Sequence, residues 1–275
     1  MPATLVHPAA VLPFCFALRK WLPVSALVIG SLTPDFEYLV RWGAGNRFSH
    51  TLSGLYFCVP AGLVAFLLFH VAVKRPMFEI LPEALRGRLL PLAWGFRWLP
   101  WWRLPLIVLA VALGAFTHQA WDSFTHYGAW GTKLFPRLEH LLFTVGDLRV
   151  RGYGLLQYLG TPVGLAVLAS ALWWWLRRTP AGAAPPSFIG RRDRAAIWAG
   201  LVLVPLMLGM AHGLTMMGPH RGAFGLRQLV AGAAMGAHAG LYAALLAYGV
   251  GVTIWQWRPE GPGNKIPAGG GEQGP

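Results

Sequence analysis

Long apolar runs alternate with short polar segments along most of the chain. A helix that crosses a bilayer needs about 20 predominantly apolar residues, and five runs reach roughly that length. These runs are residues 51–73, 104–120, 153–176, 195–216 and 229–255. The pattern predicts an all-α, polytopic bundle with about five transmembrane helices, in which residues 1–257 form one membrane-embedded domain.

Two apolar stretches near the start of the chain are too short to span a bilayer. Residues 8–16 and 21–30 predict two short helices, lying at the membrane surface or re-entrant against the bundle. Thr33 and Pro34 then match an N-cap followed by proline at the first helical position. We therefore expect a third short helix that runs through Arg41.

Glycine and proline mark the remaining organisation of the chain. Gly232, Gly236 and Gly240 recur at every fourth position of the fifth run, a spacing that lets two helices approach closely. Residues 181–190 are rich in Pro, Ala and Gly and predict a linker, and residues 258–275 predict a disordered tail.

Composition excludes an ordinary soluble domain. Hydrophobic residues make up 55% of the chain and charged residues only 12%, whereas soluble domains carry about 25% charged residues. The net charge of +13 would suit nucleic acid, but the chain has no basic helix interleaved with stacking aromatic residues. The basic residues lie in short runs between apolar segments, which favours membrane lipid, and not nucleic acid, as the partner.

Charge also bears on orientation in the membrane. Five crossings place the N-terminal region and the loops 121–152 and 217–228 on one side, with ten Lys and Arg residues against thirteen on the other. The positive-inside rule then predicts, by a small margin, that the N-terminal side is extracytoplasmic.

A stripe of chemically active residues ends the second apolar run. His118, Asp122 and His126 are four residues apart, so a helix would place them on one face. Imidazole nitrogen combined with carboxylate oxygen suits Zn²⁺ best, with Mn²⁺ and Fe²⁺ as alternatives. An interfacial hydrogen-bond network is the competing interpretation of this stripe.

Further candidate ligands fall on the same side of the predicted topology. They are His7, Asp35 and His50, with Glu37 beside Asp35. Taken singly, Asp35 could serve only the dipole of a short helix, and Glu37 could simply pair with Arg41 four positions on. Their convergence at one face predicts a metal site in which Asp35 or Glu37 acts as general base.

Other histidines and acidic residues are weaker candidates. His70 is expected at the opposite face, while His212, His220 and His238 lack neighbouring carboxylates. The loop 127–152 carries Glu139 and His140 and could lie over the site, although a solvated amphipathic loop is the simpler interpretation.

Four motifs resemble known families of membrane proteins. They are His7-Pro8-Ala9, Pro34-Asp35-Phe36-Glu37-Tyr38, Ser49-His50-Thr51 and His118-x-x-x-Asp122. Together they resemble an uncharacterised bacterial family of integral membrane proteins, related to the LexA-regulated, membrane-bound metal-dependent hydrolases. More remotely, the order of residues is similar to that of the zinc-dependent phospholipase C and single-strand nuclease superfamily.

The remote resemblance implies roles for particular residues. Asp35, His50, His118 and Asp122 would be metal ligands, with Asp122 bridging to a second ion that His7 holds. The last ligands of that superfamily's trinuclear site have no clear counterpart, apart from His126 or Glu139, so one or two ions are expected. The resemblance also implies a bacterial inner membrane as the location.

These observations predict a membrane-embedded, metal-dependent hydrolase of phospholipid or another phosphoester. Metal charge, with Arg41 or Arg47, would stabilise the developing phosphoryl anion. The alternative is a transport or scaffold protein that uses the same cluster for ion binding or proton relay. Relay carboxylates usually lie deep in the bilayer, whereas Asp35 and Asp122 lie near the ends of apolar runs, which favours a site that opens to the surface.

Overall fold

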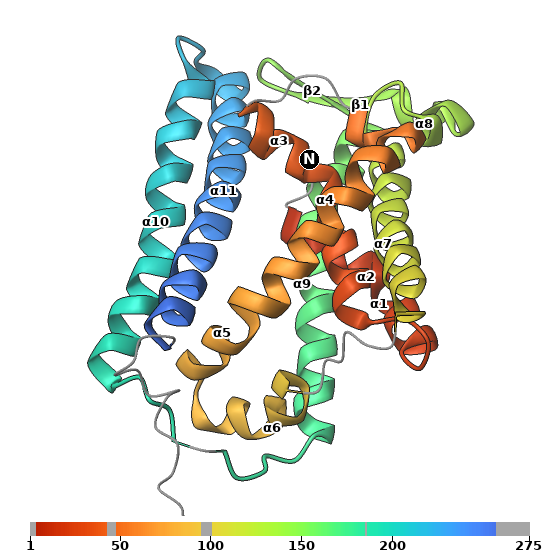
Figure 1. Ribbon diagram of the computed structural model, residues 1–275. Helices are drawn as coiled ribbons and strands as arrows, with labels where there is room; N and C mark the ends of the chain where they lie inside the picture. The colour runs from red at the N-terminus through yellow and green to blue at the C-terminus, as the bar shows by residue number, and fades with distance from the viewer. Residues whose placement is uncertain (1–3, 43–47, 95–100, 185, 257–275) are drawn as a thin grey trace, which may run out of the picture.

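The computed structural model describes residues 4–42, 48–94, 101–184 and 186–256 (Figure 1). Five helices in these ranges are long and apolar enough to cross a membrane, which confirms the predicted all-α, polytopic bundle. They are Leu52–Ile80, Arg103–Thr125, Gly152–Arg178, Arg191–Met217 and Gly222–Gln256. The predicted tail at residues 258–275 and Arg47 lie outside the described residues.

The first span consists of three consecutive helical segments. It contains α4 (Leu55–Leu68), a π-helical turn at Phe69–Val73 and α5 (Lys74–Ile80), and a 3₁₀ turn at Leu52–Gly54 precedes α4. The span therefore continues beyond the predicted end at residue 73. The other four spans are α7 (Arg103–Thr125), α9 (Gly152–Arg178), α10 (Arg191–Met217) and α11 (Gly222–Gln256). Figure 1 shows α10 and α11 as an antiparallel pair beside the remaining helices.

Three short helices form the N-terminal region, as predicted. They are α1 (Pro8–Leu18), α2 (Val24–Gly30) and α3 (Phe36–Arg41), with 3₁₀ turns at Thr4–Val6 before α1 and at Thr33–Asp35 before α3. The predicted N-cap at Thr33 is wrong by one residue. Leu32 precedes the turn, and the Thr33 hydroxyl donates backwards to the Gly30 carbonyl at 2.8 Å, so it ties the turn to the end of α2.

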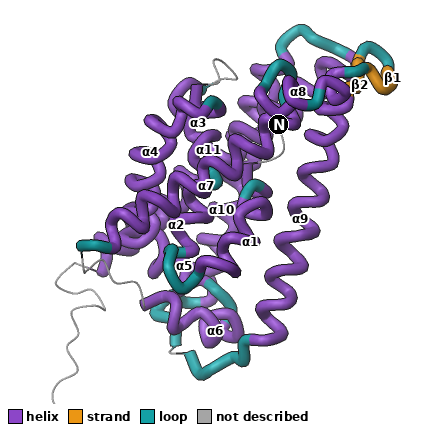
Figure 2. The backbone as a smooth tube through the Cα atoms, turned by 90° about the vertical axis from the view of Figure 1, so that its right-hand side faces the viewer, coloured by secondary structure: helices purple, strands orange, loops and turns teal. Residues whose placement is uncertain are grey.

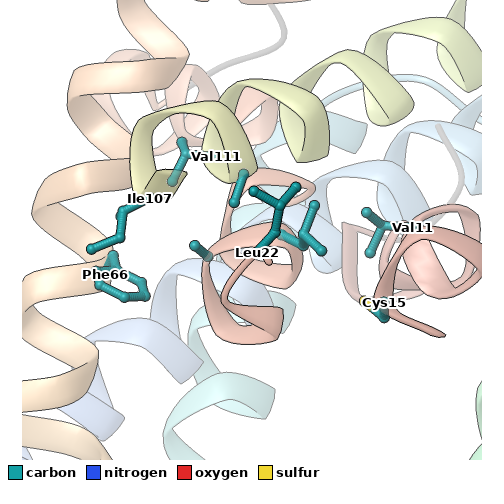
Figure 3. Close-up of a cluster of buried hydrophobic side chains, with 9 residues drawn as sticks. Val11, Cys15, Leu22, Phe66, Ile107 and Val111 are labelled. Atoms are coloured by element: carbon teal, nitrogen blue, oxygen red, sulfur yellow. The ribbon is translucent and has the colours of Figure 1, made fainter. Parts of the chain in front are cut away.

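The main hydrophobic core joins α1, α2, α4 and α7 (Figure 3). Its fully buried members include Val11 of α1, Leu27 of α2 and Val111 of α7, and Phe66 of α4 closes one side. Burial of these side chains makes the two short helices part of the bundle. This packing agrees with the predicted alternative in which α1 and α2 lie against the bundle.

Glycines allow α2 and α7 to touch backbone to backbone. A Cβ atom on Gly30 would lie 2.3 Å from the Val111 carbonyl oxygen, and one on Gly114 would lie 2.2 Å from the Leu27 carbonyl oxygen. Any side chain at either position would force the helices apart. This contact fixes the Thr33–Asp35 turn beside the last turns of α7.

The predicted packing seam on α11 is present. Added Cβ atoms at Gly232, Gly236 and Gly240 would each clash with α10, at Met216, Leu208 and Pro205 respectively. The small residues thus let α10 and α11 pack closely over much of their length.

The segment between α7 and α9, predicted to be a loop, contains a β-hairpin. The loop also contains the short helix α8 (Trp130–Leu134), a 3₁₀ turn at Pro136–Glu139, and the antiparallel strands β1 (Leu141–Val145) and β2 (Leu148–Arg151). Asp147 at the tip accepts hydrogen bonds from the Ala223 and Phe224 amides, so the hairpin reaches the start of α11. Figure 2 shows α8 and the hairpin at one end of the bundle and α6 (Glu83–Trp94) at the other.

Candidate metal centre

Five predicted ligands meet at the end of the bundle that carries α8. His7 directly precedes α1, Asp35 ends the turn before α3, and His50 ends a 3₁₀ turn at Phe48–His50. His118 and Asp122 lie one turn apart near the end of α7. All five side chains are largely buried. Segments distant in sequence thus supply three imidazoles and two carboxylates to one place.

Four donor atoms form a closed ring of alternating nitrogen and oxygen. His50 Nε2 lies 3.3 Å from Asp35 Oδ1 and 3.4 Å from Asp122 Oδ2, and His118 Nε2 lies 3.6 Å from each of the same two oxygens. Donors about 2.0–2.1 Å from a tetrahedral Zn²⁺ are separated by about 3.3 Å. These four N–O distances are therefore close to those between ligands of one cation.

His7 extends the cluster on one side. Its ring stacks on that of His118, with centroids 3.5 Å apart and planes inclined by 13°, and its Nε2 lies 3.7 Å from Asp122 Oδ1. Donor atoms of His7, Asp35 and His118 lie within 4.8 Å of one another, as do those of His50, His118 and Asp122. The two groups share His118, whose Nε2 can bind only one ion, so a second ion would need Asp122 as the bridge towards His7.

Most of these donor atoms have no hydrogen-bond partner. They are buried, and they comprise both ring nitrogens of His7, both oxygens of Asp35, Nε2 of His50 and His118, and Oδ2 of Asp122. Buried polar atoms are nearly always satisfied in native proteins, and a cluster of exceptions calls for an ion or water. A cation with nitrogen and oxygen ligands fits these residues better than a hydrogen-bond network among them.

The opposite nitrogens of two histidines are held by other groups. His118 Nδ1 lies 2.7 Å from the Ser31 carbonyl oxygen, which can only accept, so Nδ1 carries the proton and Nε2 keeps its lone pair for the cluster. His50 Nδ1 lies 3.0 Å from Ser49 Oγ. Contacts of this kind orient metal-binding imidazoles and fix their tautomers.

The turn that presents His50 is clamped from two sides. The Ser49 amide donates to Glu37 Oε2 at 2.8 Å, while Gln119 Nε2 donates to the carbonyls of Ser49 and Thr51 at 2.8 and 2.9 Å. Glu37 Oε1 pairs with Arg41 at 2.8 Å. Glu37 therefore positions His50, and both of its oxygens are engaged, unlike those of a free general base.

The members of the cluster differ in their charge at neutral pH, because burial and neighbouring charges shift their pKa values in different directions. Burial lowers the pKa of His7 to about 3, and the adjacent His118 adds to this effect. Burial alone would lower the pKa of His50, but contacts with Asp122 and Asp35 outweigh it and raise that pKa to about 9. Burial would raise the pKa of Asp35, yet the neighbouring histidines hold it well below its ordinary range. At neutral pH, Asp35 is an anion, His50 a cation and His7 neutral.

His126 departs from the predicted helical stripe. The helix α7 ends at Thr125, and His126 adopts an extended conformation as its C-cap. Its Nδ1 lies 2.9 Å from the Asp122 carbonyl oxygen and 3.7 Å from Asp122 Oδ2. The imidazole thus closes the end of α7 at the edge of the cluster, outside the two compact donor groups found among the described residues.

Three of the weaker candidates contact residues outside the donor groups. Glu139 accepts a hydrogen bond from the Gly128 amide and thereby braces its own loop. His70 lies 3.0 Å from Ser25 Oγ, and His212 packs against Trp42 with ring centroids 4.8 Å apart.

Sequence reasoning missed two polar residues that shape the site. Gln119 is buried inside a span and follows His118 directly, which is a usable signal because polar residues in spans are generally functional. Ser31 acts through its backbone carbonyl, so its side chain gave no indication.

A pocket of about 490 Å³ opens onto the cluster. His50 and Asp122 form part of its lining, and His126 and the first residues of α8 form another part. The pocket therefore borders two residues of the cluster, His50 and Asp122, while the donor atoms themselves are buried.

Comparison with known proteins gives a family match but no match to a curated protein or a solved structure. The region from residue 1 to residue 250, which includes all five clustered residues, matches the family described as "Domain of unknown function (DUF4184)". The chain belongs to this family of uncharacterised proteins.

Proposed function

We propose that this protein is a membrane-embedded, metal-dependent hydrolase of phosphoesters. His50, His118, Asp35 and Asp122 hold a Zn²⁺ ion, with Mn²⁺ and Fe²⁺ as alternatives, and His7 adds a ligand to this ion or to a second one. The observation that carries the proposal is the ring of four buried donor atoms with N–O separations of 3.3–3.6 Å, which lies beside a pocket lined in part by His50 and Asp122.

The chemistry divides between the ion and the chain. When bound, such an ion supplies Lewis acidity, which generates a nucleophile from water near neutral pH and polarises a phosphoryl oxygen. The carboxylates of Asp35 and Asp122 balance the ion's charge, and Ser31 holds His118 in the tautomer that offers Nε2. The pocket brings the phosphoester to the His50 side of the cluster.

Asp35 is better placed than Glu37 to accept a proton from water. Its Oδ2 is buried and has no hydrogen-bond partner, whereas both Glu37 oxygens are occupied by Arg41 and Ser49. Arg41 forms an ion pair with Glu37. Its guanidinium therefore helps to position Glu37. The resemblance of the motifs to membrane-bound metal-dependent hydrolases supports a metal-dependent reaction.

The site belongs to the extracytoplasmic side of a bacterial inner membrane in this proposal. It lies at the end of the bundle where α7 finishes and the first span begins, and the small excess of Lys and Arg on the opposite side supports an outside location for that end.

A metal-replacement assay tests the proposal. The purified full chain is stripped with a chelator, supplied separately with Zn²⁺, Mn²⁺ or Fe²⁺, and offered bis-p-nitrophenyl phosphate. We expect at least one ion to restore hydrolysis in the wild type and none to restore it in Asp122→Asn. Stoichiometric metal uptake without turnover of this or any lipid phosphoester would overturn the hydrolase proposal and leave a binding role.

A further inference from the structure

The pocket beside the cluster combines three kinds of surface. His50 and Asp122 bring the donor set to one side, Lys133 brings a cation, and Leu52, Tyr127 and Trp130 bring large apolar side chains. Among the described residues that line the pocket, Lys133 is the one with a permanently cationic side chain. A pocket that places an ammonium group and an apolar wall next to a metal site is complementary to an anion that carries an apolar group.

The backbone of Lys133 is fixed relative to the cluster. Thr132 is buried, and its hydroxyl donates to the His126 carbonyl at 3.1 Å and to the Ala129 carbonyl at 3.0 Å. A Cβ atom on Gly131 would lie 2.4 Å from Ser123 Oγ, so α8 packs directly on the last turns of α7. Lys133 lies within α8 and therefore has a set position in the same pocket as Asp122, where its ammonium can attract a phosphate oxygen.

The apolar wall lies where the bundle meets the membrane surface. Leu52 begins the first span, Tyr127 follows the end of α7, and Trp130 begins α8. These three side chains are 57%, 64% and 40% exposed, although each is large and hydrophobic. Aromatic residues at this level typically occupy the head-group region of a bilayer, so the wall continues the lipid-facing surface into the pocket.

We propose that the pocket binds a phosphoester that carries an apolar chain and reaches the site from the bilayer. Its phosphate lies between Lys133 and the donor set, and its chain lies along Leu52, Tyr127 and Trp130. This inference rests on the proposed hydrolase function for the identity of the reacting group. It adds the substrate class, a lipid phosphoester, and names Lys133 as the residue that recognises the phosphate.

Binding of phosphonates tests the inference without turnover. The full chain in lipid nanodiscs, supplemented with Zn²⁺, is titrated with ethyl phosphonate and with hexyl phosphonate, which share a head group and differ in chain length. We expect hexyl phosphonate to bind at least about tenfold more tightly, since each buried methylene favours binding. Equal affinities for the two phosphonates would overturn the inference. A preference for hexyl phosphonate that disappears after correction for partitioning into empty nanodiscs would overturn it as well.

Matched variants assign the two ends of the ligand. Lys133→Gln should weaken both phosphonates about tenfold, whereas Arg137→Gln, an exposed basic residue nearby in the chain but outside the pocket lining, should leave them unchanged. Leu52→Ser should remove most of the preference for the hexyl chain, while Leu134→Ser, exposed on α8 outside the lining, should preserve it. Identical effects of each variant and its control would refute the placement.

Hydrolysis of ethyl and dodecyl p-nitrophenyl phosphate separates this inference from the proposed function. Turnover of both esters with the same kcat/KM would retain the hydrolase and reject the lipid substrate. Hexyl-selective phosphonate binding without turnover of either ester would retain the lipid pocket and reject the hydrolase. A preference for the short ester would indicate a water-soluble substrate and would also reject the inference.

Discussion

Two of the clustered histidines, His50 and His118, depend on partners that hold their orientation. Glu37 is the clearest case, because sequence alone offered it as a general base while its contacts make it a support for His50. Loss of a hydrogen bond that orients a metal ligand typically lowers metal affinity about 10–100-fold. Loss of a direct ligand costs more.

Variants of Glu37 and Asp35 should therefore differ in how much metal they bind. Glu37→Gln keeps an oxygen that accepts from the Ser49 amide, so we expect full metal stoichiometry and less than about tenfold loss of affinity. Asp35→Asn should lose stoichiometric metal at the same free Zn²⁺ concentration. Competition with a fluorescent zinc chelator measures both, and equal losses in the two variants would contradict the assignment.

Metal uptake should release a proton from His50. Its pKa of about 9 means that the imidazole is protonated at pH 7.5 in the metal-free protein, and a metal binds only the neutral ring. Asp35 is already ionised and His7 already neutral, so neither adds to the release. Affinity should thus rise with pH until about pH 9.

Calorimetry in two buffers of different ionisation enthalpy counts this proton. We expect about one proton per ion at pH 7.5 in the wild type and clearly fewer in His50→Gln. A binding enthalpy that does not depend on the buffer would show that His50 is not a protonated ligand.

Among the secondary-structure elements, the crossing of α2 and α7 determines whether the site assembles. Gly114→Ala would place a methyl group against the Leu27 carbonyl and the Ser31 amide, and overpacking of this kind costs about 1–3 kcal/mol. The separation of the helices would also move Asp35 away from His118. We expect a lower unfolding temperature in detergent and at least about tenfold weaker zinc binding.

Gly200→Ala provides the matched control. This glycine lies in α10, and an added Cβ atom would meet no other atom within 4 Å. The control should retain wild-type zinc affinity and stability. Similar zinc losses in both glycine variants would show that the α2–α7 contact does not position the ligands.

The sequence predicted the long elements well and the irregular ones poorly. Spans are set by apolar length, which is visible directly, and the short helix α3 ends at Arg41 as predicted, although a 3₁₀ turn occupies its expected start at Pro34. The hairpin was missed because its strand β1 is apolar and fully exposed and therefore lacks the alternation of a half-buried strand. The Gly146-Asp147 pair between its two strands was an available turn signal.

The prediction for His126 failed for a related reason. Spacing by four residues places side chains on one face only while the helix lasts, and α7 ends one residue too early. Likewise, no local pattern could reveal that Gln119 reaches the His50 turn, because that contact depends on how α7 packs against a segment some 70 residues earlier.

For the whole molecule, the five spans place the site and the residues after α9 on opposite sides of the membrane. With Cys15 and Cys58 replaced by alanine, we expect Leu134→Cys to react with a membrane-impermeant maleimide in intact cells. Ala181→Cys should react only after permeabilisation. The reverse pattern would place the site in the cytoplasm and contradict the proposed orientation.

Metal content of the purified protein tests the central claim most directly. The full chain and the variants His118→Ala, Asp122→Ala and His220→Ala are analysed by mass spectrometry for transition metals, the last being an exposed histidine outside the cluster. We predict one or two ions per chain, zinc foremost, in the wild type and His220→Ala, and almost none in the other two. A wild-type chain without stoichiometric transition metal would contradict the account.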